Sequence, residues 1–242
     1  SDLTAGLEYN RDRLKDNMWG YNRHTDQTVN IYSAFLQNEW KNDRWGILIG
    51  GRLDKHNMVD NVIFSPRANL RFNPTQNINL RLSYSSGFRA PQAFDEDMHI
   101  ENVGGTVAMI ERAKDLKEEK SQSFSVSADM YHRFGAFQTN LLIEGFYTRL
   151  TDVFVLDRGD GILVKTRSNG PGAKVMGLTL EGKVAYLSIL QIQAGLTLQR
   201  SRYDEPHKWH DDAPAEKKIF RTPDTYGYFT ATCTPIKPLS IA

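Results

Sequence analysis

The chemically richest stretch of the chain is 89–120, which gathers acidic, basic and imidazole side chains. Three consecutive acidic residues, Asp95, Glu96 and Asp97, carry the hard oxygen ligands that Ca²⁺ prefers, but they lack the spacing of a Ca²⁺-binding loop. His99 adds an imidazole nitrogen, which is a common metal ligand. The alternative is a solvated charge run beside a hydrogen-bonded loop histidine, so a ligand site and an ordinary surface loop both stay open.

Arg89 begins this stretch, and its guanidinium has two possible roles. It could bind an anionic ligand, or it could fix the loop by pairing with a carboxylate, and we favour the second interpretation. A connection longer than about 15 residues is usually functional or disordered. The candidate ligand-binding residues are therefore Arg89, the acidic triplet and His99.

Composition and motifs exclude several classes of protein. The 30 Lys and Arg residues balance the 29 Asp and Glu residues to a formal charge of +1, so nothing suggests nucleic-acid binding. The single cysteine, Cys233, rules out an internal disulfide framework and a cysteine-rich zinc module. The sequence has no nucleophile-elbow spacing and no recognisable pair of catalytic carboxylates. It therefore does not indicate an enzyme, and it implies no required cofactor.

The elements that must position these residues are strands, because apolar and polar side chains alternate with a period of two in segments of roughly ten residues. In 176–184, apolar residues share one face of a strand while Thr179, Glu181 and Lys183 share the other. We predict an all-β, antiparallel fold with about ten strands. They lie near 3–10, 30–40, 46–54, 63–72, 77–87, 121–133, 137–150, 174–185, 189–200 and 221–234.

The connections between these strands differ in length from one rim to the other. Short turns at 41–45, 73–76, around Gly135, 187–188 and 235–238 alternate with longer connections at 11–29, 55–62, 88–120, 151–173 and 201–220. Aromatic residues sit beside the short turns: Trp40, Trp45, Phe72, Phe134, Phe137 and Tyr186. Both features are typical of an outer-membrane barrel with tight periplasmic turns, long extracellular loops and an aromatic girdle. Two rivals stay open, a soluble β-sandwich that binds carbohydrate and a complete ten-stranded barrel enzyme of the protease or lipase type.

Four sequence segments resemble motifs of the TonB-dependent outer-membrane receptors. Phe88-Arg89-Ala90-Pro91, after Leu82-Ser83-Tyr84-Ser85-Ser86-Gly87, is similar to the family's "YS.GFRAP" strand end. Asp115-Leu116-Lys117-Glu118-Glu119-Lys120-Ser121 resembles "NPDLKPE.S", with Ala113-Lys114 in place of Asn-Pro. Phe35-Leu36-Gln37-Asn38-Glu39-Trp40 resembles the "FLQNEW" strand, and the stretch from Asn169-Gly170 through Gly177-Leu178-Thr179-Leu180-Glu181-Gly182 resembles "N.G.....G.E". All four occur in the family's order.

The resemblance implies a transmembrane β-barrel of about 22 strands in the bacterial outer membrane, with its lumen plugged by an N-terminal domain. Residues 1–242 would then be a partial barrel domain that lacks the plug domain and the terminal strands. The implied partners are outer-membrane lipid, the plug domain, the TonB energy-transducing protein and a small-molecule metal complex.

The function that the resemblance implies is uptake of a scarce nutrient complex, a ferric siderophore, haem or cobalamin, as in Bacteroidetes-like receptors for iron, haem or cobalamin. Haem or a ferric complex would be the transported ligand. In some haem receptors of the family a histidine between the two loop motifs ligates the haem iron. His99 lies between Phe88-Arg89-Ala90-Pro91 and Asp115-Leu116, so the resemblance makes it a candidate haem ligand.

Overall fold

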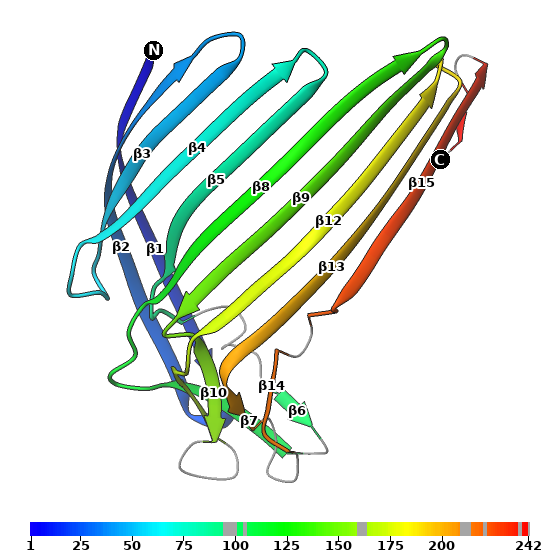
Figure 1. The fold of residues 1–242 in the computed structure, drawn as a ribbon. Helices are drawn as coiled ribbons and strands as arrows, with labels where there is room; N and C mark the ends of the chain where they lie inside the picture. The colour runs from blue at the N-terminus through cyan, green and yellow to red at the C-terminus, as the bar shows by residue number, and fades with distance from the viewer. Residues whose placement is uncertain are drawn as a thin grey trace.

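The computed structural model describes residues 1–93, 101–103, 106–158, 164–208, 214–219, 222–236 and 239–241. Most of them form one large antiparallel sheet (Figure 1), which confirms the predicted all-β fold. In spatial order its strands are β1 (Asp2–Met18), β2 (Arg23–Lys41), β3 (Trp45–His56), β4 (Ile63–Thr75), β5 (Ile78–Arg89), β8 (Glu119–Phe134), β9 (Phe137–Thr151), β12 (Ala173–Tyr186), β13 (Leu190–His207), β15 (Thr225–Ile236) and β16 (Leu239–Ile241), and β14 (Glu216–Lys218) pairs with β13.

A second sheet of four short strands lies where the longer connections gather, at the lower end of Figure 1. Its order is β10 (Phe154–Arg158), β11 (Val164–Asn169), β7 (Thr106–Arg112) and β6 (Glu101–Val103). The predicted connections 88–120 and 151–173 are therefore long, as expected, but they contain strands of their own. No helix within the described residues is long and apolar enough to cross a membrane.

The prediction of a long connection over 11–29 is wrong. β1 and β2 pair residue by residue from Asp2↔Glu39 to Met18↔Arg23, and the short 3₁₀ helix η1 (Trp19–Tyr21) joins them. The apolar alternation that marks 3–10 stops after Tyr9, and charged residues such as Arg11 and Asp12 follow on both faces. A strand with two polar faces gives no period-two hydropathy signal, so the extension could not be read from the pattern.

The turns at the opposite end are short, as predicted. β2 and β3, β4 and β5, β8 and β9, and β12 and β13 are joined there by two or three residues. Gly135, in the β8–β9 turn, has φ +57°, a left-handed conformation that glycine adopts without a Cβ penalty. The predicted asymmetry between a short-turn rim and a long-connection rim is thus confirmed.

The sheet has one apolar face and one polar face, and the strand register keeps them separate across the sheet. Leu70, Leu82, Val126, Gly145, Leu178 and Leu198 are successive register partners from β4 to β13. The next row on the other face is Arg71, Arg81, Ser127, Glu144, Thr179 and Thr197. The apolar row is open to the surroundings, with Leu82 51% and Val126 59% exposed. A belt of this kind is what a barrel presents to lipid, while polar side chains line the lumen.

Aromatic side chains mark both edges of the apolar belt. At the short-turn rim, Trp45 stacks on Phe72 with ring centroids 4.2 Å apart, and Phe134, Phe137 and Tyr186 form a continuous contact series. At the other edge, Tyr9 stacks on Tyr32 at 4.8 Å, and Tyr84 contacts Phe124 at 4.7 Å. Phe124 and Phe134 are ten positions apart on β8, which matches the roughly 9–11 residues that a tilted strand needs to span the membrane.

Candidate ligand-binding site

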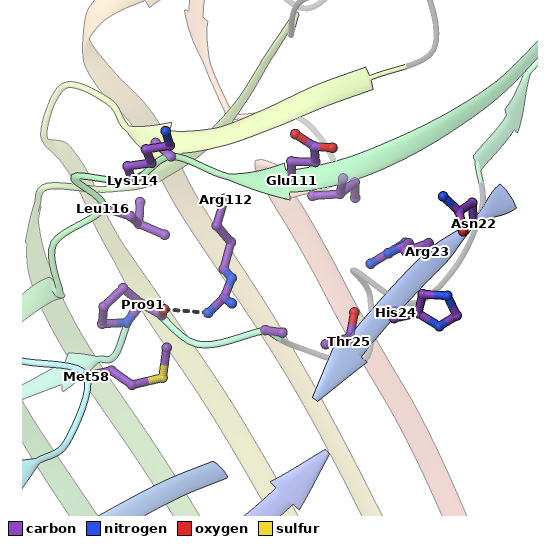
Figure 2. A pocket seen from close by; sticks show the side chains of 13 residues that line it. Asn22, Arg23, His24, Thr25, Met58, Pro91, Glu111, Arg112, Lys114 and Leu116 are labelled. Carbon is purple, nitrogen blue, oxygen red and sulfur yellow. Dashed lines mark hydrogen bonds between the residues drawn. The ribbon is translucent and has the colours of Figure 1, made fainter. Parts of the chain in front are cut away.

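A cavity of about 870 Å³ opens at the long-connection rim (Figure 2). Its walls come from three parts of the chain: residues 22–25 at the start of β2, the segment after β5 that contains Pro91, and residues 110–114 around the end of β7. Met58, between β3 and β4, and Leu116 complete the lining. The volume falls within the range of roughly 300–1,000 Å³ that small-molecule sites occupy.

Among the described residues that line the cavity, cationic side chains outnumber carboxylates. Arg23, Arg112 and Lys114 are the cations, Glu111 is the carboxylate, and His24 adds an imidazole. Figure 2 shows the Arg112 side chain extending from β7 toward Pro91. Guanidinium groups bind carboxylates and phosphates through paired N–H donors, so this lining suits an anionic ligand.

One wall of the cavity is held in place through Gln27, on the polar face of β2. Its Oε1 accepts a hydrogen bond from the backbone N–H of Ala93 at 2.8 Å and another from Arg112 Nη1 at 2.8 Å. Arg112 Nη1 also donates to the carbonyl oxygen of Pro91 at 3.1 Å. Gln27 is buried, so its amide stabilises the contact between β2, β7 and the segment after β5.

A second buried contact holds the same segment to β3. The Nδ1 atom of His56 accepts a hydrogen bond from the backbone N–H of Met58 at 3.0 Å. Its Nε2 must then carry the proton, and it donates to Oε1 of Gln92 at 3.2 Å. His56 is only 1% exposed. The residues after Arg89 are thus fixed from two strands, and Ala90 packs with Val59 and Ile63 beside them.

His56 gives this attachment a pH dependence. His56 lies one residue beyond Lys55, the register partner of Tyr32, on the side of the long connections. Burial lowers the pKa of its imidazole, although Gln92 and Asp54 oppose this shift. Above about pH 6.5 the His56 imidazole is neutral whether the segment after Arg89 is attached to β3 or detached from it, so the attachment is at full strength. Below that pH His56 takes up a proton more readily when the segment is detached. The attachment therefore weakens as the pH falls through the lowered pKa of the attached form.

We therefore expect the Ala93 amide to exchange with deuterium increasingly fast, after correction for intrinsic exchange, as the pH falls from about 7.5 to 5. The change His56→Gln keeps a polar side chain but removes the titration, so this extra pH dependence is expected to vanish. Equal pH dependence in the two proteins would contradict the assignment to His56.

A sequence profile described as "TonB dependent receptor-like, beta-barrel" matches residues 1–232. The chain belongs to this family. It is a segment of an outer-membrane receptor barrel, and membership in a family of receptors confirms the prediction that it is not an enzyme. A search of curated proteins finds no match. The two rival interpretations, a carbohydrate-binding sandwich and a barrel hydrolase, are excluded by the same match.

Solved structures support the fold of this receptor segment. The siderophore receptor PirA from Pseudomonas aeruginosa superposes with a TM-score of 0.70 at 16% identity, over 98% of this chain and 48% of PirA. The FrpB iron transporter from Neisseria meningitidis gives 0.65 at 13%, over 98% and 38%. The copper transporter OprC gives 0.67 at 13%, over 96% and 39%. The chain thus spans less than half the length of these proteins.

The TonB-dependent receptor motifs lie at points where the long connections are fastened. Asn169 Oδ1 accepts a hydrogen bond from the backbone N–H of Lys117 at 2.7 Å, and its Nδ2 donates to the carbonyl oxygens of Lys117 at 3.1 Å and Asp152 at 2.8 Å. Oε2 of Glu119 accepts from the backbone N–H of Phe154 at 2.8 Å. The "DLKEE" and "N.G" segments therefore clamp each other at the rim of the receptor barrel.

The residues predicted from the sequence as ligand-binding lie in two places. Arg89 is the last residue of β5, in register with Glu119, and its guanidinium carbon lies 5.4 Å from the centroid of the Phe154 ring. Asp95, Glu96, Asp97 and His99 fall in 94–100, outside the described residues. Their ligand-binding role, and that of His99 toward haem, stay predictions. In the part of the chain that is described, no three His, Cys, Asp or Glu side chains are grouped to hold a metal ion.

Sequence reasoning missed most of the residues that build the cavity. Gln27 and His56 lie in the predicted longer connections 11–29 and 55–62, without a motif around either residue. Arg112 and Lys114 do fall within the candidate stretch 89–120, where clustered charges were the available signal. Bringing them opposite 22–25 requires the β1–β2 hairpin to extend past the apolar belt, which the hydropathy pattern does not show.

Proposed function

We propose that this chain provides ligand-capturing walls of an outer-membrane receptor that takes up a scarce nutrient complex: a ferric siderophore, haem or cobalamin. The observation that carries the proposal is the cavity of about 870 Å³ at the rim opposite the short turns, whose described lining residues include three cationic side chains and one carboxylate. Its charge favours an anionic ferric complex or haem over cobalamin. The names of PirA, a siderophore receptor, and FrpB, an iron transporter, support iron as the nutrient element.

We also infer that the sheet is part of a closed barrel of about 22 strands around a plug domain. Within the described residues the main sheet runs from β1 to β16 as an open path, so these strands do not enclose a lumen by themselves. Captured ligand would pass through the lumen when TonB transmits inner-membrane energy to the plug. A Bacteroidetes-like source is part of the same proposal, and it rests on the four sequence motifs.

The cavity proposal is tested with Lys114→Met in the full-length receptor. Lys114 lines the cavity, and its side chain forms no hydrogen bond within the described part of the chain, so its loss removes charge without breaking the Gln27 contacts. We expect the Kd for at least one of three probes, a ferric catecholate siderophore, haemin or cyanocobalamin, to rise about tenfold. Quenching of intrinsic tryptophan fluorescence measures the binding.

Lys117→Met is the matched control, because Lys117 is an exposed lysine of the same connection that does not line the cavity. It is expected to bind all three probes as the unmodified receptor does. If Lys114→Met binds every probe with unchanged affinity, the cavity is not the capture site. Radiolabelled uptake into cells with and without TonB then tests transport separately from capture.

A further inference from the structure

The outward face of β1 changes from apolar to cationic along one row of side chains. Leu3, Ala5 and Leu7 continue the lipid-facing belt, since they pair in register with Asn38, Leu36 and Ala34 of β2. Tyr9 comes next on the same face, and the alternation then places Arg11, Arg13 and Lys15 directly beyond it. All three cationic residues are exposed.

The stacked pair Tyr9 and Tyr32 marks where the lipid-facing part of this row ends. Tyr9 is 54% and Tyr32 60% exposed, and the Tyr9 hydroxyl donates to Asn30 Oδ1 at 3.0 Å, toward the charged part of the row. Tyrosines favour the membrane interface because the ring is apolar and the hydroxyl is polar. At about 3.3 Å per residue and a tilt of about 45°, Arg11 and Arg13 stand roughly 5 and 9 Å above Tyr9, at the depth of lipid headgroups.

The charge of this row is only partly neutralised by the protein. Arg13 donates from Nε and Nη2 to the carboxylate of Asp26, at 3.2 and 2.8 Å. Asp26 is also the register partner of Lys15, whereas Arg11 is paired with Asn30. Among the described residues no carboxylate forms an ion pair with Arg11 or Lys15. Within the described residues, Arg13 is therefore the one cation of this row that is ion-paired, on a surface that adjoins the membrane.

The opposite face of the same hairpin is covered by protein. Gln27 and Val29, which alternate with Asp26 and Thr28 along β2, are buried, and Gln27 accepts hydrogen bonds from Ala93, after β5, and from Arg112 of β7. The cationic row lies on the opposite face from Gln27 and Val29, toward the surrounding membrane surface, and none of its three residues lines the cavity. Its ligand must differ from the nutrient complex that the cavity receives.

We propose that the outward face of the β1–β2 hairpin, at Arg11, Arg13 and Lys15, binds phosphorylated headgroups of lipids in the outer leaflet. Arginine presents paired N–H donors that match phosphate oxygens, and cations close to a membrane surface attract anionic lipids. The aromatic boundary directly beneath the row holds the acyl chains of such a lipid against the apolar belt. This arrangement selects a lipid over free phosphate, which would gain nothing from Tyr9, Tyr32 and Leu7.

The test compares lipid retention by the full-length receptor in neutral detergent, measured by native mass spectrometry with lipid A and with its dephosphorylated form. The double change R11Q and K15Q is expected to weaken retention of lipid A by about fivefold for each cation removed. The double change R67Q and R81Q removes the same charge from the polar face of β4 and β5 and is expected to leave retention unchanged.

Asp26→Asn tests the proposal in the opposite direction. It frees Arg13 from its ion pair, so retention of lipid A is expected to rise. Equal retention of lipid A by R11Q/K15Q and the unmodified receptor would overturn the proposal, and so would equal retention of the dephosphorylated lipid. Displacement of lipid A by millimolar inorganic phosphate would identify an ion site instead. None of these readouts involves the nutrient ligand, so the proposal stands or fails independently of the capture function.

Discussion

Replacing Leu180 by arginine is expected to destabilise the barrel by about 2–4 kcal/mol, the cost of a cation on the lipid face near the bilayer midplane. Leu180 lies at the centre of the apolar row of β12, between Leu178 and Gly182, with its register partners Ile143 and Leu196 on the same face. An arginine there cannot reach either interface without distorting the strand. Urea unfolding of the full-length receptor in phospholipid vesicles, followed by tryptophan fluorescence, measures the loss.

Thr179→Arg is the matched control, one residue away on the other face. Thr179 shares a hydroxyl contact with Thr197 at 3.1 Å on the polar side of the sheet, where water and polar groups can solvate a guanidinium. We expect a loss below about 1 kcal/mol, from the single hydrogen bond. If the two arginines cost the same, the assignment of the apolar face to lipid is wrong.

Replacing Asn169 by alanine is expected to cost about 2 kcal/mol, concentrated at the long-connection rim. The change removes the acceptor of the Lys117 backbone N–H and the donor to the carbonyls of Lys117 and Asp152, and each such bond contributes about 1 kcal/mol net. The Lys117 amide should lose most of its protection against hydrogen exchange, while amides in the middle of β12 keep theirs.

Asn169→Asp separates the two halves of this contact. The carboxylate can still accept from Lys117 N–H, but it cannot donate to either carbonyl. Protection at Lys117 should therefore be intermediate between the asparagine and alanine forms. Loss of protection throughout β12 in either variant would mean that Asn169 supports the whole strand and does not merely clamp the connection.

The membrane-spanning part of the fold was predictable because lipid imposes a repeating constraint. Every strand that crosses the apolar belt must place an apolar residue at every second position, so segments such as 77–87 and 121–133 stand out from sequence alone. The same constraint disappears beyond the aromatic edge. The extension of β1 past Tyr9 has polar residues on both faces, and its strand conformation depends on pairing with β2, which no local pattern reports.

The candidate site was only partly predictable for a related reason. Local motifs located Phe88-Arg89-Ala90-Pro91, Asp115-Leu116-Lys117 and Asn169, but not the amide side chains of Gln27 and Gln92 that fasten the first of these segments. A single amide side chain has no sequence signature, because its role depends on what the fold brings within hydrogen-bond reach. Charge clustering was more informative, since it singled out the stretch that contains Arg112 and Lys114.

The continuous register of the large sheet restricts where the chain can change length. From Leu70 to Leu198 each apolar residue is aligned with the next strand's, and short turns join half of the neighbours. Insertion of one residue within a strand would move every later side chain of that strand to the opposite face of the sheet, so that arginines would replace leucines at the lipid boundary. An insertion in one of the long connections leaves the register of the neighbouring strands unchanged. Variation in length should therefore accumulate almost entirely on the outer side of the membrane, leaving the inner rim nearly constant in length.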